Sequence, residues 1–156
     1  MKVLFMCTDN SCRSVLSEGL FNHVAPPGMT AVSSGSFPSG RLNTRALSTL
    51  QSLGVDTTAL HSKGSEQFQD SPPDIVITVC DKASGEPCPV YFGPSIKSHW
   101  GLPDPSEVDG SDEQIQAAFD ATVNHIRLRF AAFFALNHGA LEPAELKQAL
   151  DRIGEL

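Results

Sequence analysis

The sequence predicts an α/β fold in which a four-stranded parallel sheet carries helices on both faces. Short apolar runs alternate along the chain with longer stretches of helical spacing, an order that favours parallel strands joined by right-handed helical crossovers. The first run, Val3 to Met6, is apolar throughout, as is typical of a strand buried on both faces. A length of 156 residues and a hydrophobic share of 40% fit a single core.

The first half of the chain should form two strands and two helices. A helix over residues 13–24 follows the first strand and ends before two prolines and a glycine, which stop helices. Residues 30–33 form a short second strand. A second helix starts at Asn43, a residue type that caps helix N-termini, and ends at Gly54.

The second half begins with the clearest strand of the sequence, residues 74–79, and a loop rich in proline, glycine and serine follows over residues 82–94. Residues 96–100 form the last expected strand. A long helix opens at Ser111, and Pro143 starts a final short helix. We therefore expect one domain over residues 1–136 and a helical extension over residues 137–156.

Charge and hydropathy exclude several classes of partner. A formal net charge of -7 argues against nucleic acid, because phosphate backbones select basic surfaces. There is no run of about 18 apolar residues that would cross a membrane. An anion site in this acidic chain must be local, made of backbone N–H groups and an arginine.

The four cysteines are Cys7, Cys12, Cys80 and Cys88. The apolar stretch before Cys7 is too short for an export signal, so we expect a cytoplasmic, reducing compartment in which structural disulfides are rare. The cysteines are then buried residues, metal ligands or redox-active thiols.

The strongest motif runs from Cys7 to Ser14, between the first strand and the first helix. Ligands of open parallel sheets bind beyond the carboxyl ends of strands, and a loop of this length can turn its N–H groups inward as an anion-binding nest. Arg13 can then bind two oxygens of a tetrahedral oxyanion. The candidate oxyanion-binding residues are Thr8, Asp9, Asn10, Ser11, Cys12 and Arg13.

The same loop makes Cys7 a candidate nucleophile. Helix N-termini and neighbouring cations lower the pKa of a thiol, so we expect a thiolate at Cys7. Ser14 can donate a hydrogen bond to the sulfur. Cys12 is a candidate backup thiol, although we expect it to pack beneath the loop.

These motifs make the chain similar to the low-molecular-weight protein tyrosine phosphatases, a flavodoxin-like fold, and within that fold to the arsenate reductases coupled to thioredoxin. The resemblance rests on Cys7 to Ser14, Glu18, residues 33–35, the strand ending in Cys80, and residues 100–105. Asp9 departs from the family, which usually has glycine there. Asp tolerates a left-handed backbone, and its carboxylate should point outward to avoid repelling the anion.

The resemblance implies that Asp104, followed by Pro105, is a general acid that protonates the oxygen leaving when Cys7 attacks. Phosphatases of this fold usually carry aromatic residues after the Asp-Pro pair, whereas Ser106, Glu107 and Val108 follow here. Two further cysteines also favour reduction over phosphate ester hydrolysis, because two thiols that form a disulfide supply two electrons.

The resemblance further implies a relay. Cys7 forms an adduct with arsenate, Cys80 attacks the Cys7 sulfur, and Cys88 then moves the disulfide to Cys80–Cys88, which thioredoxin reduces. About one extra residue between Cys80 and Cys88, compared with the best-known members, leaves glutaredoxin with glutathione as an alternative reductant.

Three other interpretations remain open. The chain could be a low-molecular-weight protein tyrosine phosphatase, or an oxyanion-binding domain without catalysis. The four cysteines could also hold zinc, although neither pair has the Cys-x2-Cys spacing that zinc sites favour. No cofactor is expected.

Some reductases of this fold hold a potassium ion beside the loop, at positions that match Asn10, Glu18, Ser33 and Lys63. Members with the ion have Asp at the position where this chain has Lys63. The resemblance therefore implies that the Lys63 ammonium replaces the ion and pairs with Glu18.

Overall fold

The computed structural model describes residues 1–81, 85–86 and 93–156, and its strands form one parallel sheet. The strands are β1 (Lys2–Cys7), β2 (Thr30–Gly35), β3 (Ile75–Thr78) and β4 (Ile96–His99). Their order in the sheet is β2-β1-β3-β4, and each neighbouring pair is parallel. The predicted four-stranded parallel sheet is confirmed.

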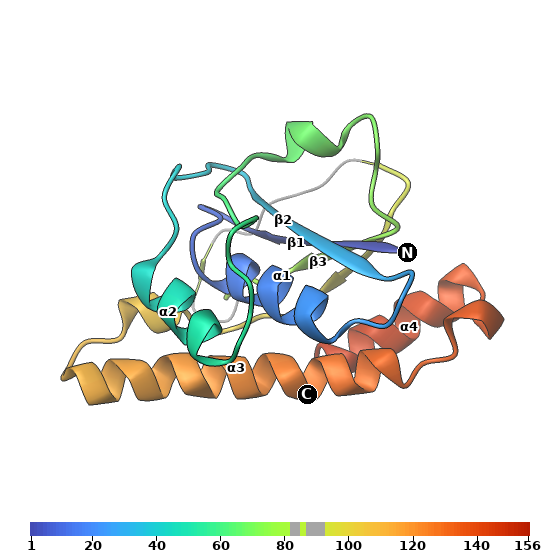
Figure 1. Ribbon diagram of the computed structural model, residues 1–156. Coiled ribbons are helices and arrows are strands. Elements are labelled where there is room, and N and C mark those ends of the chain that lie inside the picture. Colours follow the sequence, from blue (N-terminus) through green and yellow to red (C-terminus); the bar gives the residue numbers. More distant parts are fainter. Residues whose placement is uncertain (82–84, 87–92) are drawn as a thin grey trace.

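The α-helices lie together against one face of the sheet (Figure 1). They are α1 (Arg13–Val24), α2 (Thr44–Ser52), α3 (Asp112–Phe134) and α4 (Pro143–Ile153). All four contribute side chains to a core that includes Val3 and Phe5 of β1. On the other face, Leu4 and Met6 pack with Phe68. Among the described residues, the helical cover of that second face is the short 3-10 helix η1 (Ser65–Phe68).

Local signals explain the helix boundaries. The side chain of Asn43 accepts a hydrogen bond from the Ala46 N–H at 2.9 Å, which caps α2. Ser111 and Gln114 form a reciprocal capping box at the start of α3. Strand β2 extends two residues beyond the expected 30–33, because its last residues, including Gly35, pair with the end of β1.

The C-terminal helix α4 belongs to the same hydrophobic core. Leu146, Leu150 and Ile153 are buried in it, and the indole N–H of Trp100 donates to the Leu150 carbonyl at 2.9 Å. The Ser98 hydroxyl of β4 also donates to Asp151 at 2.7 Å. Helix α4 thus packs along β4, while the division of the chain after residue 136 stays a prediction.

The parallel register decides where the site lies. Met6 of β1 pairs with Thr78 of β3, and the Val79 N–H donates to the Met6 carbonyl at 2.9 Å. Cys7, the last residue of β1, and Cys80, two residues after β3, therefore lie at the same edge of the sheet. In the described ranges, every helix is too short or too polar to cross a membrane.

Candidate active site

The loop between Cys7 and α1 is held open by hydrogen bonds to the segment that follows β2. The carbonyls of Thr8, Asp9 and Ser11 accept backbone N–H bonds from Phe37, Ser39 and Asn43, at 2.8, 3.0 and 2.8 Å. In a trans peptide the following N–H points opposite to the carbonyl. The next N–H groups of the loop are therefore turned away from that segment, as an anion nest requires.

Asn10 fixes the shape of this loop from inside. It is fully buried and has a φ of 49°, the left-handed conformation that asparagine tolerates. Its side-chain N–H₂ donates to Ser14 at 2.8 Å and to Ser33 at 3.0 Å, and its carbonyl oxygen accepts the Lys63 backbone N–H at 2.9 Å. Asn10 rather than Asp9 thus takes the left-handed conformation.

The Cys7 sulfur lies 2.9 Å from the Ser14 hydroxyl oxygen, within hydrogen-bonding reach. Burial raises the pKa of the Cys7 thiol above its ordinary value, and hydrogen bonds from Ser14 and from the Asn10 backbone offset part of this effect. The expected low pKa at Cys7 is therefore wrong for this arrangement. The physical reason is that burial removes the Cys7 sulfur from water, which disfavours the thiolate.

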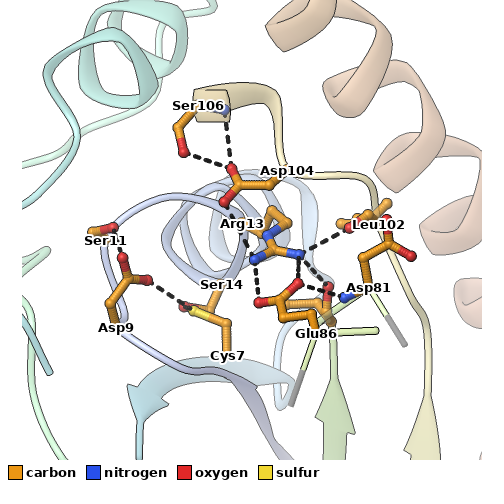
Figure 2. Close-up of polar contacts among 11 residues, drawn as sticks. Cys7, Asp9, Ser11, Arg13, Ser14, Asp81, Glu86, Leu102, Asp104 and Ser106 are labelled. Carbon is orange, nitrogen blue, oxygen red and sulfur yellow. Dashed lines mark hydrogen bonds and ion pairs between the residues drawn. The ribbon is translucent and has the colours of Figure 1, made fainter. Parts of the chain in front are cut away.

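The Asp9 carboxylate also departs from expectation. One of its oxygens accepts a long hydrogen bond from the Cys7 thiol, with 3.9 Å between sulfur and oxygen, and the other accepts a bond from the Ser11 hydroxyl at 2.9 Å (Figure 2). One carboxylate oxygen thus turns toward the loop instead of outward, and its charge adds to the rise in the pKa of Cys7.

Arg13 is buried at the start of α1, and its guanidinium contacts acidic side chains (Figure 2). Its two terminal nitrogens donate to the two carboxylate oxygens of Glu86 at 2.6 and 2.7 Å. One also donates to the Leu102 carbonyl at 2.9 Å, and the other to Asp104 at 3.4 Å. Arg13 was expected to bind two oxygens of an oxyanion, and in this structure it forms that bidentate contact with the Glu86 carboxylate.

Asp104 begins the 3-10 helix η3 (Pro105–Glu107), and one of its oxygens accepts the Ser106 N–H at 2.9 Å and the Ser106 hydroxyl at 2.6 Å. The other oxygen faces Arg13. Asp104 and Arg13 line an open cavity of about 550 Å³. The remaining lining residues are Thr8, Asp9, Asp81, Gly85, Glu86 and Glu107.

The cysteines that the structure describes differ in their surroundings and in their bonding. Cys7 and Cys12 are free thiols, and Cys12 is buried in the main core, which raises its pKa. Cys80 is fully buried and disulfide-bonded. Cys88 lies outside the described residues. Among those that are described, no group of three or more histidine, cysteine or acidic side chains could hold a metal ion.

Lys63 lies within the structure, with a relative exposure of 7%. Its ammonium group is 3.3 Å from Glu18 and donates to the His61 carbonyl at 3.1 Å. The Ser33 hydroxyl donates to the same Glu18 oxygen at 2.7 Å. A chain of hydrogen bonds therefore leads from Lys63 through Glu18 and Ser33 to the loop that holds Cys7.

The sequence interpretation missed Glu86. Its carboxylate accepts two bonds from Arg13 and a third from the Asp81 backbone N–H at 2.7 Å. The available signal was an acidic residue between Cys80 and Cys88. Spacing alone does not show that this carboxylate reaches back across the sheet edge to Arg13.

The family profile described as "Low molecular weight phosphotyrosine protein phosphatase" matches residues 2–149. The chain belongs to this family. Its four-stranded parallel sheet is thus the sheet of a family member.

Individual relatives are more specific. An arsenate reductase of Halalkalibacterium halodurans is 30% identical over 84% of this chain and 93% of its own. A glutaredoxin arsenate reductase of Synechocystis is 34% identical over 67% of this chain and 78% of its own. Among solved structures, the thioredoxin-dependent arsenate reductase of Corynebacterium glutamicum matches with a TM-score of 0.61 and 26% identity, over 85% of this chain and 61% of that one.

Proposed function

We propose that this protein reduces arsenate to arsenite, with Cys7 as the nucleophile and Cys80 as the second thiol. The observation that carries the proposal is the disulfide-bonded Cys80 at the same sheet edge as Cys7. A hydrolytic phosphatase needs no redox partner for its nucleophile, whereas reduction of As(V) needs two electrons. The arsenate reductases among the relatives support the same choice.

The first step is attack of the Cys7 sulfur on arsenic. The loop N–H groups and Arg13 hold the oxyanion, and Ser14 is placed to stabilise the sulfur at 2.9 Å. Asp104, which lines the cavity together with Arg13, delivers the proton with which one oxygen leaves as water. The product is a covalent adduct of Cys7 with As(V).

The second step transfers the electrons. The Cys80 thiolate attacks the Cys7 sulfur, the sulfur–arsenic bond breaks, and its electron pair leaves with arsenite. A Cys7–Cys80 disulfide remains, so two thiols have been oxidised for one As(V) reduced to As(III). Cys88 then attacks Cys80, which frees Cys7 and leaves Cys80–Cys88 as the disulfide to be reduced.

The reductant that we propose is thioredoxin, in a cytoplasmic compartment. Cys7 and Cys80 are both buried, so a protein reductant would have to attack the Cys80–Cys88 disulfide at the Cys88 sulfur. Glutaredoxin with glutathione is the alternative, which the relative in Synechocystis supports by its name.

Arsenite formation tests the function. Wild type should form arsenite with thioredoxin, thioredoxin reductase and NADPH. Cys7→Ser should lose at least about a thousandfold in rate, because a serine oxygen is a far weaker nucleophile than a cysteine sulfur and cannot form the disulfide with Cys80. Replacing the thioredoxin system by glutaredoxin and glutathione identifies the reductant.

Cys80→Ser provides the matched control. It should lose multiple turnovers of arsenate but keep any slow hydrolysis of p-nitrophenyl phosphate, which needs only Cys7, Arg13 and Asp104. Normal arsenate turnover by Cys80→Ser would contradict the relay. Fast ester hydrolysis by wild type without arsenite formation would favour the phosphatase.

The position of the disulfide tests the role of Cys88. After one turnover with arsenate and no reductant, peptide mapping of wild type should find Cys80 linked to Cys88. Cys88→Ser should stop with Cys7 linked to Cys80. A stable Cys7–Cys80 species in wild type would remove Cys88 from the relay and favour glutathione as the reductant.

A further inference from the structure

We propose that Glu86 is an internal competitor of arsenate: while Cys80 is disulfide-bonded, the Glu86 carboxylate occupies the Arg13 guanidinium and excludes the oxyanion. The inference rests on the proposed function only in naming arsenate as the anion. It assigns to Glu86 a role that controls when the site can accept substrate.

The Glu86 carboxylate is bound as an oxyanion would be. Its two oxygens accept parallel hydrogen bonds from the two terminal nitrogens of Arg13, at 2.6 and 2.7 Å. The backbone N–H of Asp81 donates a third bond at 2.7 Å. A bidentate arginine together with a backbone N–H is a donor set that also suits a tetrahedral oxyanion.

The remaining donors of Arg13 are used as well. Each terminal nitrogen of a guanidinium carries two protons. One proton on each nitrogen serves Glu86, and the second ones serve the Leu102 carbonyl and the Asp104 carboxylate. The terminal N–H groups of Arg13 therefore all have protein acceptors, and arsenate can use them only if one of these acceptors withdraws.

Charge identifies Glu86 as the acceptor that must withdraw. The carboxylates of Glu86 and Asp104 both face the single guanidinium of Arg13, whose side chain is only 5% exposed. The cavity is also lined by Asp9, Asp81 and Glu107. Adding an arsenate dianion to these negative charges is unfavourable. If the Glu86 carboxylate leaves Arg13 as arsenate arrives, the added negative charge beside the guanidinium is smaller.

The contact with Arg13 favours the ionised form of Glu86, which is the form that can compete with an oxyanion. Its hydrogen bonds with Arg13 are the main cause that lowers the pKa of its carboxyl group. Its side chain is 22% exposed, so the carboxylate can exchange its contacts for water when it leaves. Asp104 is comparably exposed, at 21%, but it contacts only one terminal nitrogen of Arg13, at 3.4 Å. Its withdrawal would not free the bidentate position that Glu86 occupies, and the Leu102 acceptor is a main-chain carbonyl.

The proposed relay connects this contact with redox state. Seven residues separate Cys80 from Cys88, and Glu86 is one of them. If Cys80 bridges Cys88, Glu86 therefore lies within the ring that the disulfide closes. A closed ring restricts the chain conformations open to Glu86, and reduction removes that restriction. Arsenate would then load only onto the reduced enzyme, which alone has the thiols to convert it.

Phosphate binding tests the proposal without any turnover. We would oxidise the full chain, verify the Cys80 disulfide by peptide mapping, and titrate wild type and Glu86→Gln with inorganic phosphate by calorimetry. Glu86→Gln keeps the shape of the side chain but removes its charge. It should bind phosphate at least about tenfold more tightly than wild type, because Arg13 loses its charged competitor. After reduction, the difference should fall below about threefold.

Glu107→Gln is the matched control, since it removes one negative charge from the same cavity without a bond to Arg13. Its gain in phosphate affinity should stay below about threefold, as expected for a screened charge. Equal gains for Glu86→Gln and Glu107→Gln, or weaker binding by Glu86→Gln, would overturn the proposal. Equal gains by Glu86→Gln in the oxidised and reduced forms would overturn its link to the disulfide.

The same variants separate this inference from the proposed function. If Glu86→Gln shows the gain in phosphate affinity but wild type forms no arsenite, the function is wrong and the role of Glu86 as a competing anion stands. If wild type forms arsenite and Glu86→Gln shows no gain, only the proposal on Glu86 is wrong.

Discussion

At the scale of single residues, Lys63 and Glu18 show how a buried charge can support the nucleophile without touching it. The ammonium of Lys63 pairs with Glu18, which accepts a bond from Ser33, which in turn accepts one from Asn10. Asn10 also donates to Ser14, the neighbour of the Cys7 sulfur. We propose that the Lys63 ammonium takes the place of a potassium ion beside this network.

Lys63→Asp should make the protein depend on potassium. The substitution leaves two buried carboxylates together, and breaking a buried pair in this way costs about 3–5 kcal/mol. A bound potassium ion should restore much of that loss. Thermal unfolding in potassium chloride and in choline chloride should therefore differ for Lys63→Asp and agree for wild type. A clear potassium stabilisation of wild type would contradict the replacement.

At the scale of elements, the contact between the end of β2 and the Cys7 loop requires a residue without a side chain, Gly35. A Cβ atom at Gly35 would lie 2.5 Å from the Thr8 carbonyl oxygen and 2.8 Å from the Asn10 backbone nitrogen. Both are main-chain atoms of the loop, which cannot move without changing the nest. Gly35 therefore allows β2 to approach the loop, and its φ is not in the left-handed region.

Gly35→Ala should destabilise the fold by about 1–3 kcal/mol, the usual range for overpacking, and should weaken phosphate binding by the reduced protein. Urea unfolding and calorimetry measure the two effects. Gly139→Ala is the control, because a Cβ there meets no atom within 4 Å. Unchanged phosphate affinity in Gly35→Ala would show that the loop does not depend on this contact.

At the scale of the whole molecule, one aromatic core joins the sheet to helices from both ends of the chain. Phe5 of β1 contacts Phe21 of α1 and Phe130 of α3, with ring centroids 5.9 and 5.7 Å apart. Trp100 contacts Phe130 and donates its N–H to the Leu150 carbonyl of α4. Helix α4 therefore covers the sheet next to β4, and we expect it to unfold together with the rest.

Leu150→Ala should lower the free energy of unfolding of the entire chain by about 2–5 kcal/mol, since Leu150 is fully buried. Circular dichroism and tryptophan fluorescence should report one common transition. Lys147→Ala, which removes an exposed i,i+4 pair with Asp151, should cost at most about 1 kcal/mol. An early separate transition of α4 in Leu150→Ala would instead favour an independent extension over residues 137–156.

The sequence by itself determined the elements and the position of the anion loop. Periodicity and caps are local signals, so α1, α3 and α4 begin and end close to their predicted residues. The continuous apolar run of β1 predicted a strand buried on both faces, and Cys7 follows it at the edge where parallel sheets bind ligands.

Only the tertiary structure decided how the charges are paired. The bond between Arg13 and Glu86 spans 73 positions, and no local pattern encodes such a contact. The expected low pKa of Cys7 assumed that the helix N-terminus and Arg13 give the sulfur a positive environment. The structure places Arg13 against acidic partners and buries Cys7, because electrostatic and desolvation effects depend on which residues the fold brings together.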